Sequence, residues 1–173
     1  MLHREALFIA EQLKSELSPL CERIEIAGSV RRQKPDVGDI ELVAIPKMIS
    51  SGDLLGTPIS AFARNDFTKL GVVLKHGPRY VQIALHRARI NLDFFLVLPP
   101  ASWGVIFTLR TGPDTFSRSC VTPRSKRGLL PSYLQVKDGA VRHAATGEII
   151  PTPEEKDFFR VLEMQWIPPD KRR

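Results

Sequence analysis

Apolar residues near the start of the chain recur with a helical period. In residues 4–17, Leu7, Ala10 and Leu13 lie three positions apart, and charged residues occupy other positions. Because residues three and four apart share one face of a helix, this spacing predicts an amphipathic helix that ends near Pro19.

Later segments alternate between polar and apolar residues with a period of two, as half-buried strands do. In residues 39–45, Asp39 and Glu41 fall on one face, and Ile40 and Leu42 fall on the other. The elements predicted in this part of the chain are strands over residues 23–26, 39–45, 72–74, 80–85 and 91–97, a helix over residues 60–70 and a hairpin turn at residues 76–78.

The second half of the chain begins after Pro99-Pro100, where a boundary is predicted between a domain of residues 1–99 and a domain of residues 100–173. The elements predicted there are a helix around residues 103–108, a turn at 111–114, a basic segment at 118–127, and a small sheet over 133–150 with turns at 138–139 and 146–147. A final helix is predicted, with Thr152 as its N-cap and Glu155 completing a capping box.

The composition is ordinary for a soluble globular protein. Of the 173 residues, 43% are hydrophobic and 25% are charged, and no apolar run approaches the ~20 residues of a membrane-spanning helix. The first residues are interrupted by charges and lack the apolar block of a signal peptide, so the cytoplasm of a bacterial, archaeal or viral host cell is the expected location.

The two cysteines and four histidines are scattered, which excludes a disulfide framework and a structural zinc site. The net charge of +6 suits an anionic partner.

The face that carries Asp39 and Glu41 is the first candidate for chemistry. Residues two apart on a strand project from the same face, about 7 Å apart, and Asp93 on another predicted strand can complete an all-oxygen cluster. Clustered carboxylates repel one another unless cations lie between them. Hard oxygen ligands select Mg²⁺ or Mn²⁺, and two such ions can activate an attacking hydroxyl. The alternative is that these acids are only the solvent face of an edge strand.

Residues directly before this strand favour phosphate binding. Gly28-Ser29 follows a predicted strand, where a glycine lets backbone amides approach a triphosphate and the Ser29 hydroxyl adds a donor. Arg31 and Arg32 carry guanidinium groups that match phosphate oxygens, and Gly38 allows a close approach beside Asp39. A basic surface turn is the alternative for this segment.

In order, these residues read G-S-V-R-R-x5-G-D-I-E, followed by a strand that bears Asp93. This pattern closely resembles the nucleotidyltransferase superfamily that includes DNA polymerase beta. The second half of the chain contains Trp103-Gly104 before Thr111-Gly112, which resembles the W-G…T-G element of polymerase X enzymes, and residues 147–169 resemble their closing lobe. The chain is thus similar to a minimal, two-lobed member of the DNA polymerase X family.

The resemblance implies an α+β fold. Residues 1–99 would form a nucleotidyltransferase palm, with helices flanking a mixed sheet, and residues 100–173 a small α+β closing lobe. Asp39, Glu41 and Asp93 would hold two Mg²⁺ or Mn²⁺ ions, with Asp93 closest to the primer hydroxyl. The residues implied in nucleotide binding are Gly28, Ser29, Arg32, Gly38, Thr111, Gly112, Asp114, Ser117 and Arg118. Those implied in gripping the DNA backbone, for which plain solvated surface is the alternative, are Arg124, Lys126 and Arg127.

Four residues depart from the family pattern. Glu41 stands where these polymerases usually carry aspartate, Asn91 stands where an arginine commonly accompanies the third acid, and Leu109-Arg110 replaces an aromatic pair. Related nucleotidyltransferases use D-x-E, so the first departure bears on the substrate rather than on activity. No counterpart of the lyase domain of larger members is expected among the first 25 residues.

The activity that the resemblance implies is that of a DNA-directed DNA polymerase, which adds dNMPs to a primer 3′-OH by two-metal-ion transfer, in short gaps during DNA repair. Its partners would be primer-template or gapped DNA and dNTPs, with no membrane, and the chain is expected to be a monomer. One alternative is a template-independent or non-DNA nucleotidyltransferase, with a terminal, tRNA, protein or small-molecule acceptor. An enzyme that acts on a tRNA end, a protein or a small molecule should lack the W-G…T-G element. A catalytically silent nucleic-acid-binding module is another alternative, and it requires the loss of an acid.

Overall fold

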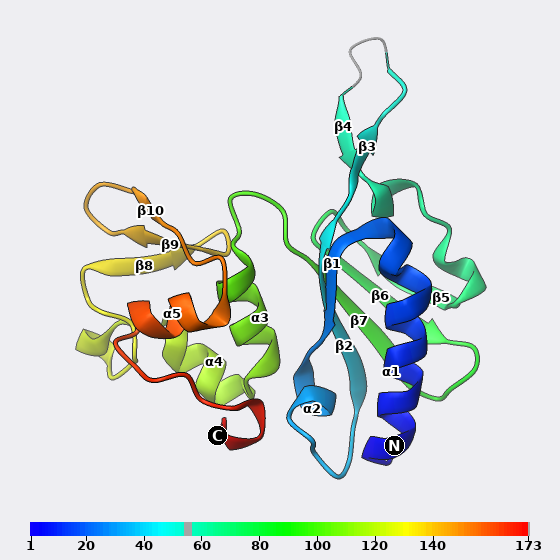
Figure 1. Cartoon of the computed structure of the whole chain (residues 1–173), viewed down its shortest axis with the longest axis horizontal. Helices are drawn as coiled ribbons and strands as arrows, with labels where there is room; N and C mark the ends of the chain where they lie inside the picture. The colour runs from blue at the N-terminus through cyan, green and yellow to red at the C-terminus, as the bar shows by residue number, and fades with distance from the viewer. Residues whose placement is uncertain (54–56, 173) are drawn as a thin grey trace. The chain divides into compact units, whose positions relative to one another are not determined.

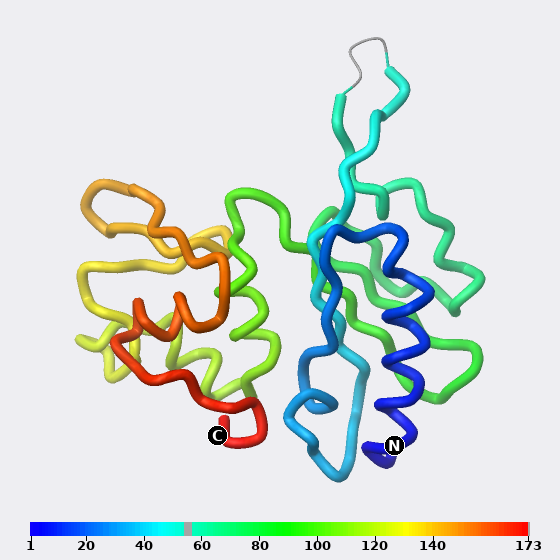
Figure 2. The backbone as a smooth tube through the Cα atoms, viewed as in Figure 1, coloured from blue at the N-terminus to red at the C-terminus, as the bar shows by residue number. Residues whose placement is uncertain are grey.

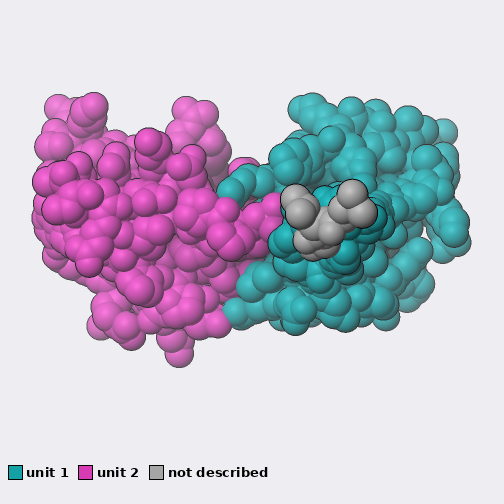
Figure 3. Space-filling model, turned by 90° about the horizontal axis from the view of Figure 1, so that it is seen from above, with its two compact units in different colours: residues 1–30, 35–96 teal, residues 31–34, 97–173 magenta. Residues whose placement is uncertain are grey.

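The computed structural model describes residues 1–53 and 57–172 (Figures 1 and 2). The chain divides into two units: Met1–Val30 with Pro35–Leu96 form unit 1, and Arg31–Lys34 with Val97–Arg173 form unit 2 (Figure 3). Unit 2 thus includes seven residues that the sequence analysis assigned to the first domain, Arg31–Lys34 and residues 97–99. The fold is α+β, as predicted. Within the described residues, none of the helices has the length and apolar character needed to span a bilayer.

The sheet of unit 1 is mixed, with five strands in the order β1-β2-β7-β6-β5. β2 and β7 are parallel, and the other neighbouring pairs are antiparallel. The strands are β1 (Cys21–Ile26), β2 (Asp39–Pro46), β5 (Gly71–His76), β6 (Tyr80–Leu85) and β7 (Asn91–Leu96). Each of the five strands predicted in this part of the chain is present, with ends that differ by at most two residues.

Helix α1 (His3–Leu17) runs along this sheet and supplies part of its core (Figure 1). Its buried residues Ala6, Ala10 and Leu13 share one hydrophobic core with Ile40 on β2. The predicted helix is confirmed. Leu7 is 37% exposed, however, because the buried face of the helix contains Ala6 and not Leu7.

The predicted helix over residues 60–70 is wrong. The segment forms two short 3₁₀ turns, η2 (Ala61–Arg64) and η3 (Phe67–Lys69), after the small hairpin of β3 (Met48–Ser50) and β4 (Pro58–Ser60). Asp66 interrupts the helix, since its carboxylate accepts bonds from the backbone and the hydroxyl of Thr68. Short polar side chains compete with helix formation in this way.

Unit 2 combines three helices with a small antiparallel sheet. The helices are α3 (Trp103–Thr111), α4 (Asp114–Val121) and α5 (Glu155–Val161), the 3₁₀ turns are η4 (Arg124–Lys126) and η5 (Pro169–Lys171), and the strands are β8 (Leu134–Lys137), β9 (Ala140–His143) and β10 (Ile149–Ile150). The sheet and both of its turns were predicted. Helix α4 was not, although Phe116 and Cys120 are buried one turn apart on it.

The start of α5 differs from the predicted one by two residues. Glu154 is the N-cap, and it forms a capping box with Asp157 rather than Thr152 forming one with Glu155. Thr152 is buried, and its hydroxyl lies 2.6 Å from that of Ser102. The predicted cap is therefore wrong, because packing in the core engages Thr152 before the helix begins.

Candidate active site

Strands β2 and β7 bring the three predicted acids onto one face of the sheet of unit 1. Glu41 and Asp93 are partners in the parallel register, and Asp39 is the partner of Asn91. These residues are half-buried, whereas Ile40 and Leu92 between them are fully buried on the opposite face. The alternation of each strand therefore arises from one packed face and one polar face.

The carboxylates do not form a closed cage in this structure. Among the described residues, no group of three or more His, Cys, Asp or Glu side chains is gathered closely enough to hold a metal ion. A metal site here requires the carboxylates of Asp39, Glu41 and Asp93 to draw together. A divalent cation favours that movement, because it offsets their mutual repulsion.

The side chain of Glu41 packs against the backbone at Gly28. An ideal Cβ on Gly28 would lie 1.8 Å from Oε2 of Glu41, and the φ angle of Gly28 is +59°. Only glycine adopts this left-handed conformation readily and leaves room for the carboxylate. The requirement for glycine at this position is therefore set by its own backbone and by the neighbouring acid.

Gly28→Ala is expected to lower the free energy of unfolding by about 1–2 kcal/mol, because the methyl group displaces the Glu41 carboxylate and strains the backbone. Gly38→Ala is the matched control, since a Cβ there meets no atom within 4 Å. We expect the control to be unchanged or stabilised by up to about 1 kcal/mol. Urea unfolding of both variants measures the difference. Equal stability of Gly28→Ala and wild type would contradict the packing described here.

The hydroxyl of Ser29 is a buried donor that has no hydrogen-bond partner among the residues that the structure describes. Such groups are rare in folded proteins, and an ordered water or a bound ion can account for them. Ser29 follows Gly28 and lies in the same unit as the three acids. A phosphate oxygen would satisfy this hydroxyl, so the residues present fit an anionic ligand with a bound cation.

Two residues near Asp93 were missed by the sequence analysis. Tyr80 and Gln82, on β6, both donate hydrogen bonds to Oδ1 of Asp93. They alternate along β6 on the same face as the acids. Their two-residue spacing was visible in the sequence, but the pairing of β6 with β7 was needed to connect them with Asp93.

Arg31 and Arg32 bond to residues of unit 2. The guanidinium of Arg31 donates to both carboxylate oxygens of Glu155, at 2.9 and 2.8 Å, and to the hydroxyl of Thr111 at 2.7 Å. Nη1 of Arg32 donates to the backbone oxygen of Thr111 at 2.6 Å. In this structure the donors of Arg31 thus meet protein acceptors, although the sequence suggested a phosphate ligand.

Glu155 is the buried centre of a charged cluster that the sequence analysis treated as a helix cap. Besides Arg31, it accepts hydrogen bonds from Arg172 at 2.8 Å and from Trp166 at 3.3 Å. Burial of Glu155 by itself raises its pKa, but the hydrogen bonds from Arg31 and Arg172 outweigh burial and lower the pKa from 4.5 to about 2. The carboxylate is therefore ionised over the whole physiological range.

The other residues predicted to contact nucleotide occur in and before α4. Gly112 is tightly packed, since an added Cβ would lie 2.5 Å from the ring of Phe116. The hydroxyl of Ser117 donates to the backbone oxygen of Leu109 at 2.6 Å. Asp114 and Arg118 form an exposed ion pair one helical turn apart. These contacts hold the turn between α3 and α4 in place.

The residues predicted to grip DNA have different surroundings. Arg124 donates to the carboxylate of Glu163 at 2.6 Å and to the backbone oxygen of Leu162 at 2.8 Å. Lys126 and Arg127 are exposed. All three side chains thus lie on the surface of unit 2, and the guanidinium of Arg124 is bonded to a neighbouring acid.

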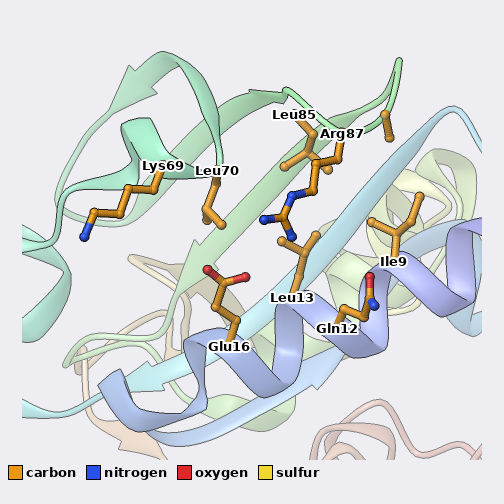
Figure 4. A pocket seen from close by; sticks show the side chains of 9 residues that line it. Ile9, Gln12, Leu13, Glu16, Lys69, Leu70, Leu85 and Arg87 are labelled. Carbon is orange, nitrogen blue, oxygen red and sulfur yellow. The ribbon is translucent and has the colours of Figure 1, made fainter.

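A small cavity in unit 1 is lined by none of the predicted site residues (Figure 4). It lies between Ile9 and Leu13 of α1 and the side chains of Leu70, Leu85 and Arg87, and its volume is about 70 Å³. Ligand pockets usually measure roughly 300–1,000 Å³. This cavity is too small to be the binding site for a nucleoside triphosphate.

Comparison with known families bears on the C-terminal part of the chain. Residues 107–173 match the model of the DNA polymerase beta thumb. This part of the chain is similar to that thumb. The match supports the relationship to the DNA polymerase X family that the sequence motifs suggested. No curated protein matches the chain.

The thumb-like segment covers most of unit 2, from within α3 through α5 and the C-terminal residues. It includes Thr111, Gly112, Asp114 and Glu155. It does not include the three acids of unit 1, whose assignment rests on the order of motifs and on the strand register.

Proposed function

We propose that this chain is a metal-dependent nucleotidyltransferase that adds deoxynucleotides to the 3′ end of a DNA primer, in short gaps of a repair substrate. The match of residues 107–173 to the DNA polymerase beta thumb carries the proposal, because this C-terminal segment is similar to part of a DNA polymerase. The common polar face of Asp39, Glu41 and Asp93 supports it, since polymerase chemistry needs a set of hard oxygen ligands.

In this proposal, Asp39, Glu41 and Asp93 bind two Mg²⁺ or Mn²⁺ ions. When bound, such ions would act as Lewis acids that activate a hydroxyl nucleophile and stabilise the leaving pyrophosphate. Asp93 orients the primer hydroxyl. The Ser29 hydroxyl, which has no partner within residues 1–53 and 57–172, donates to a phosphate oxygen.

Residues of unit 2 contribute to binding of the nucleotide and of DNA. We assign contacts with the incoming nucleotide to the segment around Gly112, Asp114, Ser117 and Arg118, and a phosphate contact to Arg32. Lys126 and Arg127, which are exposed, are assigned to the DNA backbone, where the release of counterions favours binding. Arg124 is also assigned to the DNA backbone, and this contact requires its hydrogen bond to Glu163 to break.

A primer-extension assay tests this function. The purified chain is expected to extend the primer of a one-nucleotide gap in Mg²⁺, with dNTPs, and much more weakly a single-stranded primer of the same sequence. Excess EDTA should abolish extension, and added Mg²⁺ should restore it. Equal extension of single-stranded DNA would favour a template-independent transferase. A chain that binds gapped DNA but incorporates no nucleotide with either metal would contradict the proposal.

A further inference from the structure

Two neutral donors from β6 converge on one oxygen of Asp93. The hydroxyl of Tyr80 donates to Oδ1 at 2.8 Å, and Nε2 of Gln82 donates to the same atom at 2.9 Å. Both distances are those of well-formed hydrogen bonds. Two donors satisfy the lone pairs of one carboxylate oxygen, so the rotation of the Asp93 side chain is fixed and Oδ2 is left for other ligands.

The register of the sheet sets this arrangement. Gln82 is the cross-strand partner of Asp93, and Tyr80 is the partner of Phe95, two residues further along the same face. Partners directly opposite each other have Cβ atoms about 4.5–5.5 Å apart, within reach of a hydrogen bond between long and short side chains. A slip of one residue would turn both donors to the buried face.

The ring of Tyr80 is held by contacts other than its hydrogen bond. It stacks on Phe95, with ring centroids 5.1 Å apart and an angle of 26° between the planes. The ammonium group of Lys75 lies 5.7 Å from the centroid of the Tyr80 ring. Because these contacts fix the ring, the hydroxyl is directed at Asp93 before any ligand binds.

We propose that Tyr80 and Gln82 are positioning residues that anchor Asp93 through Oδ1 and present Oδ2 to the metal ion and the primer hydroxyl. This inference rests on the proposed function and deepens it. In the polymerases that this chain resembles, an arginine commonly stands at the position of Asn91. Here the donors that orient the acid are neutral, so they leave its negative charge available to a cation, which an arginine would partly offset.

Near-isosteric variants of the full chain test the inference. Tyr80→Phe removes only the hydroxyl and keeps the stacked ring, and Gln82→Met removes the donor at similar size. Tyr133→Phe is the matched control, because Tyr133 is the other tyrosine of the chain and is 59% exposed in unit 2. Electron paramagnetic resonance of free Mn²⁺ measures metal binding without DNA or nucleotide, and gap filling over a series of Mg²⁺ concentrations measures activity.

We expect each single variant to weaken Mn²⁺ binding about 3- to 10-fold and the double variant about 10- to 100-fold, since outer-sphere partners of metal ligands have effects of this size. Tyr133→Phe should bind Mn²⁺ like wild type. The lost activity should return in part at high Mg²⁺, which a general loss of structure would not allow. Wild-type Mn²⁺ affinity in the double variant would overturn the inference.

Asp93→Ala separates this inference from the proposed function. If Asp93→Ala loses metal binding and activity while the Tyr80 and Gln82 variants keep both, only the positioning role fails. If Asp93→Ala keeps both, the proposed function itself fails. The NMR signals of the Gln82 side-chain amide give a check in folded protein, because they should shift on Asp93→Ala. Unchanged signals would also overturn the inference.

Discussion

Asp39→Ala is expected to reduce nucleotide addition by about 10³-fold or more, and Glu41→Ala and Asp93→Ala are expected to do the same. Each variant removes a carboxylate that we propose as a metal ligand, and metal ions contribute several kcal/mol to stabilising charge in the transition state. Each 1.36 kcal/mol corresponds to a tenfold change in rate. Steady-state filling of a one-nucleotide gap, at fixed Mg²⁺, measures the loss.

The fold should survive these substitutions. Asp39, Glu41 and Asp93 are half-buried on the polar face, and removing one of several clustered acids relieves repulsion. We therefore expect urea midpoints equal to or slightly above that of wild type for Asp39→Ala and Glu41→Ala, and a slightly lower midpoint for Asp93→Ala, which leaves Tyr80 and Gln82 without their acceptor. Glu22→Ala is the matched control, because it removes an exposed acid of β1 in the same unit. Near-normal turnover by any of the three variants, or a similar loss in Glu22→Ala, would refute the site.

The strands that carry the acids could be predicted because each has one buried face. Ile40 and Leu92 are fully buried and alternate with polar residues, so the period of two is strong in the sequence. The parallel pairing of β2 with β7, which makes Glu41 the partner of Asp93, is a tertiary property with no local signal. For the same reason, the hydrogen bonds of Tyr80 and Gln82 to Asp93 could not be inferred.

Predictions from local sequence motifs were wrong where tertiary packing determines the contacts of a side chain. A capping box was expected to engage Glu155, yet this side chain is buried at the centre of a cluster with Arg31 and Arg172. Arg31 and Glu155 are 124 positions apart, so no motif spacing connects them. The sequence suggested that Arg31 binds phosphate because an arginine after Gly-Ser suits an anion, but the anion that it meets in this structure is the Glu155 carboxylate.

Glu155→Gln is expected to lower the free energy of unfolding of unit 2 by about 3–5 kcal/mol. The side chain of Arg172 is fully buried and that of Arg31 is 21% exposed, so the variant leaves two guanidinium groups without their shared anion. Removing one partner of a buried ion pair has a cost of this size, because the remaining charge is desolvated without compensation. Urea unfolding, which does not screen charges, measures the change.

Glu148→Gln is the matched control for this variant. Glu148 is an exposed glutamate of the same unit, and its replacement also removes one negative charge. We expect its free energy of unfolding to stay within about 0.5 kcal/mol of wild type. A loss in Glu148→Gln as large as that in Glu155→Gln would mean that net charge, rather than the buried cluster, is responsible.

The pH dependence of stability gives a sharper test of the charge on Glu155. Its pKa is lowered from 4.5 to about 2 in the folded chain, so its ionised form stabilises the fold fully above pH 4.5, and this contribution is lost as the pH falls toward about 2. A pKa difference of this size corresponds to roughly 3 kcal/mol of unfolding free energy. The gap in unfolding free energy between wild type and Glu155→Gln should therefore be constant from about pH 7 to pH 5 and should shrink below about pH 4.5. A gap that stays constant down to about pH 3 would show that the shape and hydrogen bonds of Glu155, rather than its ionisation, stabilise the cluster.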